Sequence, residues 1–226
     1  MVENDKEFAN IPESLFELNV EFQEPMLEAW NKHPYGIVEA LYQALKAWGV
    51  TLENAMWEKD PKTIRDARVA FEIPRASSII RAGLETLSFT AFNQDWESAP
   101  QILPLFGAVT AKVVNFGSVA VSDFRTILAL HVIPGPRPFV ESMRNLVNAK
   151  ALGQAQMYGF SIYNQDSTIM LDKSVKYPGG VFVRLDRNFP GTTLFKEIVA
   201  ALHQDQVKAL GFLGIPGNVS SPPKES

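Results

Sequence analysis

The sequence contains no cysteine and only three histidines among its 226 residues. The absence of cysteine excludes disulfides, thiol nucleophiles, iron–sulfur ligation and cysteine-based zinc sites. Histidine is the commonest general base and a common metal ligand, so three widely spaced histidines leave few ways to build either kind of centre. We therefore expect neither a metal ion nor a cofactor.

The chain also lacks the short motifs that carry phosphate-binding and hydrolytic chemistry. It has no P-loop, no GxGxxG following a strand, no GxSxG, no HExxH and no EF-hand loop. These absences exclude several large enzyme classes, but they leave open an enzyme built from scattered residues.

Charge and hydropathy restrict the partners further. The formal net charge is −4, and lysine and arginine do not cluster, so we expect no nucleic-acid partner and no anionic membrane surface. No apolar run approaches the roughly 20 residues that span a bilayer. The opening MVENDKEFAN is acidic and polar, unlike a secretory signal. We expect a soluble, cytoplasmic protein.

The longest run of strand-forming residues is Val119–Ile133, which turn residues bound on both sides. Its apolar residues alternate onto both faces, which is typical of a strand inside a sheet. We therefore expect this strand near the middle of the sheet.

The remaining periodicities predict an α+β fold, with a mixed or antiparallel sheet of about seven strands and about four helices. Phe16, Leu18, Val20 and Phe22 alternate with polar residues, as in a half-buried strand. Helical spacing predicts helices over about 36–48, 98–114, 138–149 and 193–210. Further strands are expected around residues 69–73, 79–80, 87–91, 158–162, 169–171 and 181–185.

The order of these elements suggests an internal duplication. Residues 14–115 and 118–210 both read as βαβββα-like units, although chance also produces such orders and no residue-level repeat is visible. We expect a flexible leader at 1–13, one globular region at 14–213, and a disordered tail at 214–226, which is rich in proline, serine and glycine.

Four polar residues are candidates for a binding site: Arg125, His131, Arg184 and Arg187. The planar guanidinium group of arginine binds carboxylates and phosphates through bidentate hydrogen bonds. The plainer interpretations are a buried histidine hydrogen-bonded to backbone and a salt-bridged hairpin end that faces water. Arg75 and Arg81 flank Ser77-Ser78 and form a further candidate anion site or a solvated turn.

Three aromatic residues are candidates for an interface: Trp30, Trp57 and Phe212. They lie in segments without the periodicity of a core face, and such aromatics are enriched where proteins meet. The alternative is packing beneath a loop.

Two functional hypotheses remain. The first is a non-enzymatic binding or assembly protein that acts through protein–protein contacts, with a homodimer as the simplest assembly. The second is a small-molecule enzyme or ligand-binding protein with a groove between the two halves. Convergence of the candidate polar residues on a pocket would favour the second hypothesis.

Overall fold

The computed structural model describes residues 10–31, 36–57, 63, 66–93, 99–133 and 159–213. The strands are β1 (Asn10–Phe22), β2 (Ala55–Trp57), β3 (Val69–Ile73), β4 (Ser78–Ala82), β5 (Thr86–Phe92), β6 (Val121–Ile133), β7 (Phe160–Tyr163), β8 (Ser167–Lys173) and β9 (Val181–Pro190). The helices are α1 (Leu27–Asn31), α2 (Gly36–Leu45), α3 (Ala99–Gly117) and α5 (Phe195–Phe212), with short 3-10 turns at Lys46–Trp48, Leu52–Asn54 and Pro74–Ala76.

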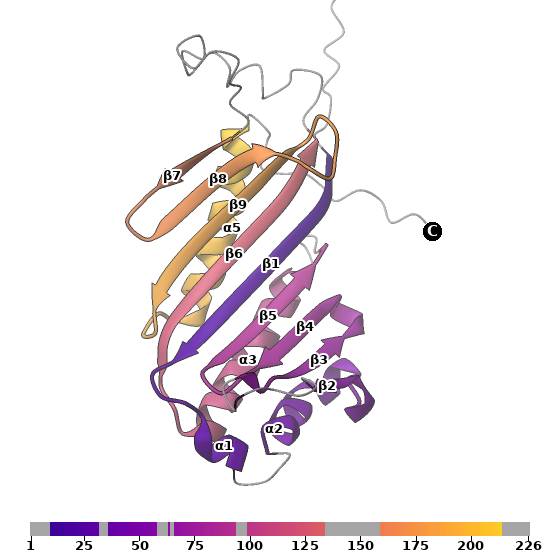
Figure 1. Ribbon diagram of the computed structural model, residues 1–226, viewed down its shortest axis with the longest axis vertical. Coiled ribbons are helices and arrows are strands. Elements are labelled where there is room, and N and C mark those ends of the chain that lie inside the picture. The colour runs from indigo at the N-terminus through magenta and orange to yellow at the C-terminus, as the bar shows by residue number, and fades with distance from the viewer. Residues whose placement is uncertain are drawn as a thin grey trace, which may run out of the picture. The chain divides into compact units, whose positions relative to one another are not determined.

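The nine strands form one antiparallel sheet in the order β2-β3-β4-β5-β1-β6-β9-β8-β7 (Figure 1). The chain divides into two compact units. The β7–β8 unit contains the described residues of 1–14, 127–187 and 201–226, and the α2–α3 unit contains those of 15–126 and 188–200. β1, β6, β9 and α5 each contribute residues to both units.

In the α2–α3 unit, the alternation predicted for β1 is confirmed. Phe16, Leu18, Val20 and Phe22 are all buried, at 8%, 0%, 0% and 7% exposure. β1 pairs with β5, where Phe89 contacts Phe16 at 6.3 Å and Phe106 of α3 at 4.8 Å between ring centroids. One face of these strands therefore packs against α3, which Figure 1 shows behind β5.

The helix predicted over 36–48 is also confirmed, as α2 followed by a 3-10 turn. Ile37, Leu41 and Leu45 are buried and share one helical face. Gly49 ends the turn with φ at +78°, a left-handed conformation that glycine adopts without steric cost.

In the β7–β8 unit, the predicted central strand appears as β6, which lies between β1 and β9 in the sheet. Leu128, Leu130 and Val132 are buried on one face, as are Val181 and Val183 of β9. The chain turns between β8 and β9 at Tyr177-Pro178-Gly179-Gly180, as predicted, and Gly179 has φ at +76°.

The prediction of about seven strands and about four helices was wrong in number, although the α+β class holds. The described residues contain nine strands and three helices of ten residues or more, with α1 as a fourth helix of only five residues. β2 has only three residues, Ala55–Trp57, which is too short to show alternation in the sequence. The helix predicted at 138–149 lies outside the described residues.

The predicted duplication finds no support in this architecture, because the two compact units interleave along the chain. β1 begins at Asn10, within the segment expected as a leader. The tail predicted at 214–226 lies outside the described residues and stays a prediction.

No helix in the described part of the chain is both long enough and apolar enough to cross a membrane.

Candidate functional site

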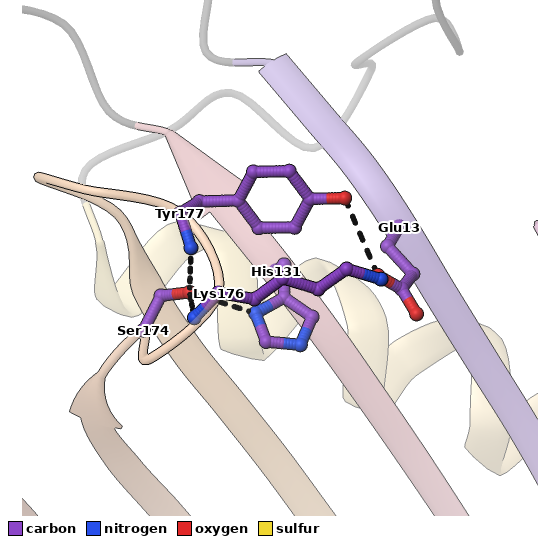
Figure 2. Close-up of polar contacts among 5 residues, drawn as sticks. All are labelled: Glu13, His131, Ser174, Lys176 and Tyr177. Atoms are coloured by element: carbon purple, nitrogen blue, oxygen red, sulfur yellow. Dashed lines mark hydrogen bonds and ion pairs between the residues drawn. The ribbon is translucent and has the colours of Figure 1, made fainter.

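Within the described residues, two places gather side chains that merit a functional interpretation, one in each unit. The first is a polar cluster in the β7–β8 unit, which consists of Glu13, His131, Ser174, Lys176 and Tyr177 (Figure 2). Glu13 comes from β1, His131 from β6, and the other three from the turn between β8 and β9.

Ser174 organises the turn. Its Oγ accepts hydrogen bonds from the backbone N–H groups of Tyr177 at 2.9 Å and Lys176 at 3.3 Å. Two further bonds close the loop, because Ser174 N–H donates to Gly180 O at 2.9 Å and Gly180 N–H donates to Tyr177 O at 2.9 Å. The Ser174 hydroxyl therefore takes the place of water as the hydrogen-bond acceptor for two backbone N–H groups that the turn leaves unpaired.

His131 completes the set of bonds to Ser174, with its Nδ1 3.0 Å from Ser174 Oγ. Both lone pairs of that oxygen are already used by backbone N–H groups, so the hydroxyl proton points to Nδ1. The neutral tautomer with its proton on Nε2 satisfies this arrangement. The imidazole also packs against the rings of Tyr177 and Phe182, at 5.3 and 5.1 Å between centroids.

The Ser174–His131 pair has the composition of a nucleophile and its base, but its surroundings favour a structural role. Ser174 is only 2% exposed, so a substrate cannot reach Oγ without opening the turn. An activated nucleophile also needs a free lone pair to attack, and here backbone donors occupy both. His131 itself is half-buried, and its contact is with a serine hydroxyl and not with the backbone expected from the sequence.

Glu13 ties the same turn to β1. Lys176 Nζ donates to Glu13 Oε2, and Tyr177 Oη donates to the same oxygen at 3.3 Å. The hydrogen bond from Lys176 lowers the pKa of Glu13 below its usual value, and Tyr177 and the positive charge of Lys176 add to the effect. The bond to Glu13 correspondingly raises the pKa of Lys176. Both side chains are substantially exposed, so solvent screens the pair.

Arg187 and Arg184, two of the predicted anion-binding residues, contact carboxylates of the protein itself. Arg187 Nε and Nη2 donate to the two oxygens of Asp205 on α5, at 2.8 and 2.5 Å, and Nη1 lies 3.2 Å from Asp166. Asp205 raises the pKa of Arg187 through this bidentate bond. Arg184 Nε and Nη2 donate to Asp186 at 2.8 and 3.1 Å.

The structure does not bring the four predicted binding residues to one described pocket. Arg125 is exposed on β6, and His131 is half-buried beside Ser174. A ligand-binding role for these residues stays a prediction. Among the described residues, no three histidines, aspartates or glutamates lie close enough to share a metal ion.

The second place is a hollow of about 350 Å³ in the α2–α3 unit. It is lined by three apolar residues and four polar residues: Met56, Trp57 and Ala70, and Arg68, Arg81, Thr86 and Ser88. This volume falls within the range of small-molecule sites, about 300–1,000 Å³.

Strand register explains how distant residues meet in this hollow. Met56 of β2 lies opposite Ala70 of β3, Ala70 lies opposite Arg81 of β4, and Arg81 lies opposite Ser88 of β5. Residues directly opposite one another in a sheet point to the same face, so all four share one side. The neighbouring positions Phe71, Ile80 and Phe89 point to the other face and are fully buried there.

The structure places the three predicted interface residues differently. Trp57 is 43% exposed at the end of β2. Trp30 lies in α1, and its Nε1 is buried without a hydrogen-bond partner among the described residues. Phe212 is the last residue of α5, and its side chain lies outside the described part of the structure.

Sequence reasoning considered Arg81 together with Arg75, but the structure groups Arg81 with Arg68 instead. Arg75 lies against Gly49, where a Cβ would meet its Nε at 3.0 Å. Arg68, Thr86 and Ser88 were not singled out, and no signal in the sequence marks them, because their meeting depends on strand register.

Comparison with known proteins finds no family model and no curated protein that matches this chain. One solved structure with some likeness is that of a "putative adenylate cyclase" from Bacillus halodurans, which is 12% identical in sequence. The match covers 94% of this chain and 80% of that chain, with a TM-score of 0.16. A likeness at this level establishes neither a shared fold nor a shared activity.

Proposed function

We propose that this is a non-enzymatic binding protein that acts through protein–protein contacts and assembles as a homodimer. The observation that carries the proposal is an exposed apolar surface at β2. Leu52, Met56 and Trp57 are 58%, 42% and 43% exposed and lie within six residues of one another. We call these three residues the β2 surface. Large exposed apolar side chains that lie close together along the chain are typical of contact sites.

The position of β2 favours a second copy of the chain as the partner. β2 stands at one end of the strand order, so among the described strands it pairs only with β3. A terminal strand presents backbone N–H and C=O groups that another strand can pair with. When two identical strands pair antiparallel about a two-fold axis, each supplies hydrogen-bond partners for the backbone groups of the other, and a closed dimer results.

The polar cluster supports a role without catalysis. Ser174 is buried, its lone pairs are taken by backbone donors, and His131 is committed to the same oxygen. Arg184 and Arg187 hold carboxylates of the protein itself. These groups stabilise the fold, and the cytoplasmic location expected from the sequence is retained in this proposal.

Light scattering coupled to size exclusion tests the proposal. We expect a mass of twice the 25.1 kDa of one chain at micromolar concentration. Substitution of the β2 surface by Met56→Ser with Trp57→Ser removes apolar contact area and should shift the protein to monomer, because interface aromatics carry a large share of binding energy.

The matched control is Tyr163→Ser, which removes an aromatic side chain that is 78% exposed on β7 at the other end of the strand order. It should leave the dimer intact. A wild-type mass of 25.1 kDa, or a dimer that survives the double substitution, contradicts the proposal.

A further inference from the structure

We infer that the hollow lined by Arg81 binds a small organic anion in which a carboxylate or phosphate is attached to a planar apolar group. We call this hollow the Arg81 site. The inference concerns a ligand site and does not rest on the proposed dimer.

Arg81 supplies the charge. Its Nη1 donates to Thr90 Oγ1 at 3.3 Å. Across the part of the chain that the structure describes, no carboxylate forms an ion pair with it. A guanidinium has five N–H donors in a rigid fork, and one long hydrogen bond to a hydroxyl leaves most of them for another acceptor. Arg184 and Arg187 differ in this respect, because each is bound to an aspartate.

The surroundings of Arg81 suit an oxyanion. Thr86 and Ser88 lie on β5 two residues apart, so both hydroxyls are on the same face of the sheet as the guanidinium. Hydroxyls donate to carboxylate and phosphate oxygens alongside arginine. Arg68 adds a second guanidinium to the lining, and one of its N–H groups donates to Ala67 O at 3.0 Å.

The rest of the lining is apolar and predicts the rest of the ligand. Trp57, Met56 and Ala70 are the three apolar residues that line the same hollow. An indole offers a flat surface for an aromatic ring, and a methionine side chain adapts to its outline. A hollow with one apolar wall and a few grouped polar side chains is the usual form of a small-molecule site.

Titration calorimetry with four probes tests the ligand chemistry. Phenyl phosphate and benzoate carry both the ring and the anion, inorganic phosphate carries the anion alone, and benzyl alcohol is the uncharged control. We expect phenyl phosphate or benzoate to bind with a dissociation constant below about 1 mM. Inorganic phosphate should bind about tenfold more weakly, and benzyl alcohol should not bind. Comparison of phenyl phosphate with benzoate distinguishes a phosphate from a carboxylate as the preferred group.

Two single substitutions locate the site. Arg81→Gln removes the guanidinium and should weaken binding by about tenfold or more, the scale of one charge-assisted hydrogen bond. Arg75→Gln removes the same charge from an exposed arginine of the same unit that does not line the hollow, and it should leave binding unchanged. Both residues are exposed, so both variants should unfold at the wild-type temperature, which circular dichroism checks.

The inference fails if no probe binds the wild-type protein at about 10 mM. It also fails if Arg81→Gln and Arg75→Gln weaken binding equally, since that result would indicate a nonspecific charge effect. Equal binding of benzyl alcohol and phenyl phosphate would show an apolar hollow without an anion site and would likewise overturn it. Met56 and Trp57 belong to both the β2 surface and the Arg81 site. None of these binding measurements reports the mass of the protein, so light scattering tests the proposed dimer separately.

Discussion

Asp205 is fully buried, and its ion pair with Arg187 offsets the cost of removing the carboxylate from water. A carboxylate taken out of water loses several kcal/mol of hydration unless charged donors replace the solvent. The bidentate contact of Arg187 with both oxygens of Asp205 does this, while Asp166 shares the exposed side of the guanidinium. The pair links β9 to α5 within the β7–β8 unit.

We therefore predict that Arg187→Met lowers the free energy of unfolding by about 3 kcal/mol, because it leaves a buried charge without a partner. Urea unfolding of the variant measures the change. The control is Lys208→Met, which removes an exposed cation from α5, the helix that carries Asp205. This variant should change stability by less than about 0.5 kcal/mol. The double variant Arg187→Met with Asp205→Leu should recover most of the loss, and an Arg187→Met protein as stable as the control would refute this account.

At the scale of elements, the turn between β8 and β9 is held from two sides. Ser174 and His131 fix its interior, and Glu13 binds Lys176 and Tyr177 at its exterior. Glu13 lies near the start of β1, so this contact joins elements more than 160 residues apart in the sequence. The lowered pKa of Glu13 makes the exterior contact dependent on pH.

Because folding lowers the pKa of Glu13 from its usual 4.5, the ionised carboxylate stabilises the folded state. This stabilisation is fully present above pH 4.5 and is lost as the pH falls through the lower folded-state value. We predict that Glu13→Gln slightly destabilises the protein near neutral pH, and that the difference from wild type disappears in acid. The effect should be small, since the pair is exposed and salt screens it.

Unfolding curves at several pH values measure this difference, with Glu53→Gln as a control for the loss of an exposed carboxylate. A difference from wild type that grows as the pH falls below 4.5 would show that the contact with Lys176 is not its source.

For the whole molecule, the sequence predicts what alternation and turn chemistry determine locally. The burial of Phe16 and Leu18, the interior position of β6 and the turn at Gly179 all follow from short patterns. The number of strands does not, because β2 has three residues and leaves no periodicity. The Arg81 site depends on the register of four strands, and the Arg187–Asp205 contact depends on where α5 packs. Strand register and helix packing both depend on residues that are far apart in the sequence, so no short pattern predicts them.

Amide hydrogen exchange at residues 55–57 tests the central claim, that this protein binds a second copy of itself through β2. We predict that the amides of this strand that face away from β3 exchange slowly at high protein concentration, where the paired strand protects them, and faster on dilution as the dimer dissociates. The amides of β7, at the other end of the strand order, should be unaffected by dilution. Exchange rates in β2 that do not depend on concentration, in a protein that light scattering shows to be a monomer throughout, would contradict the claim.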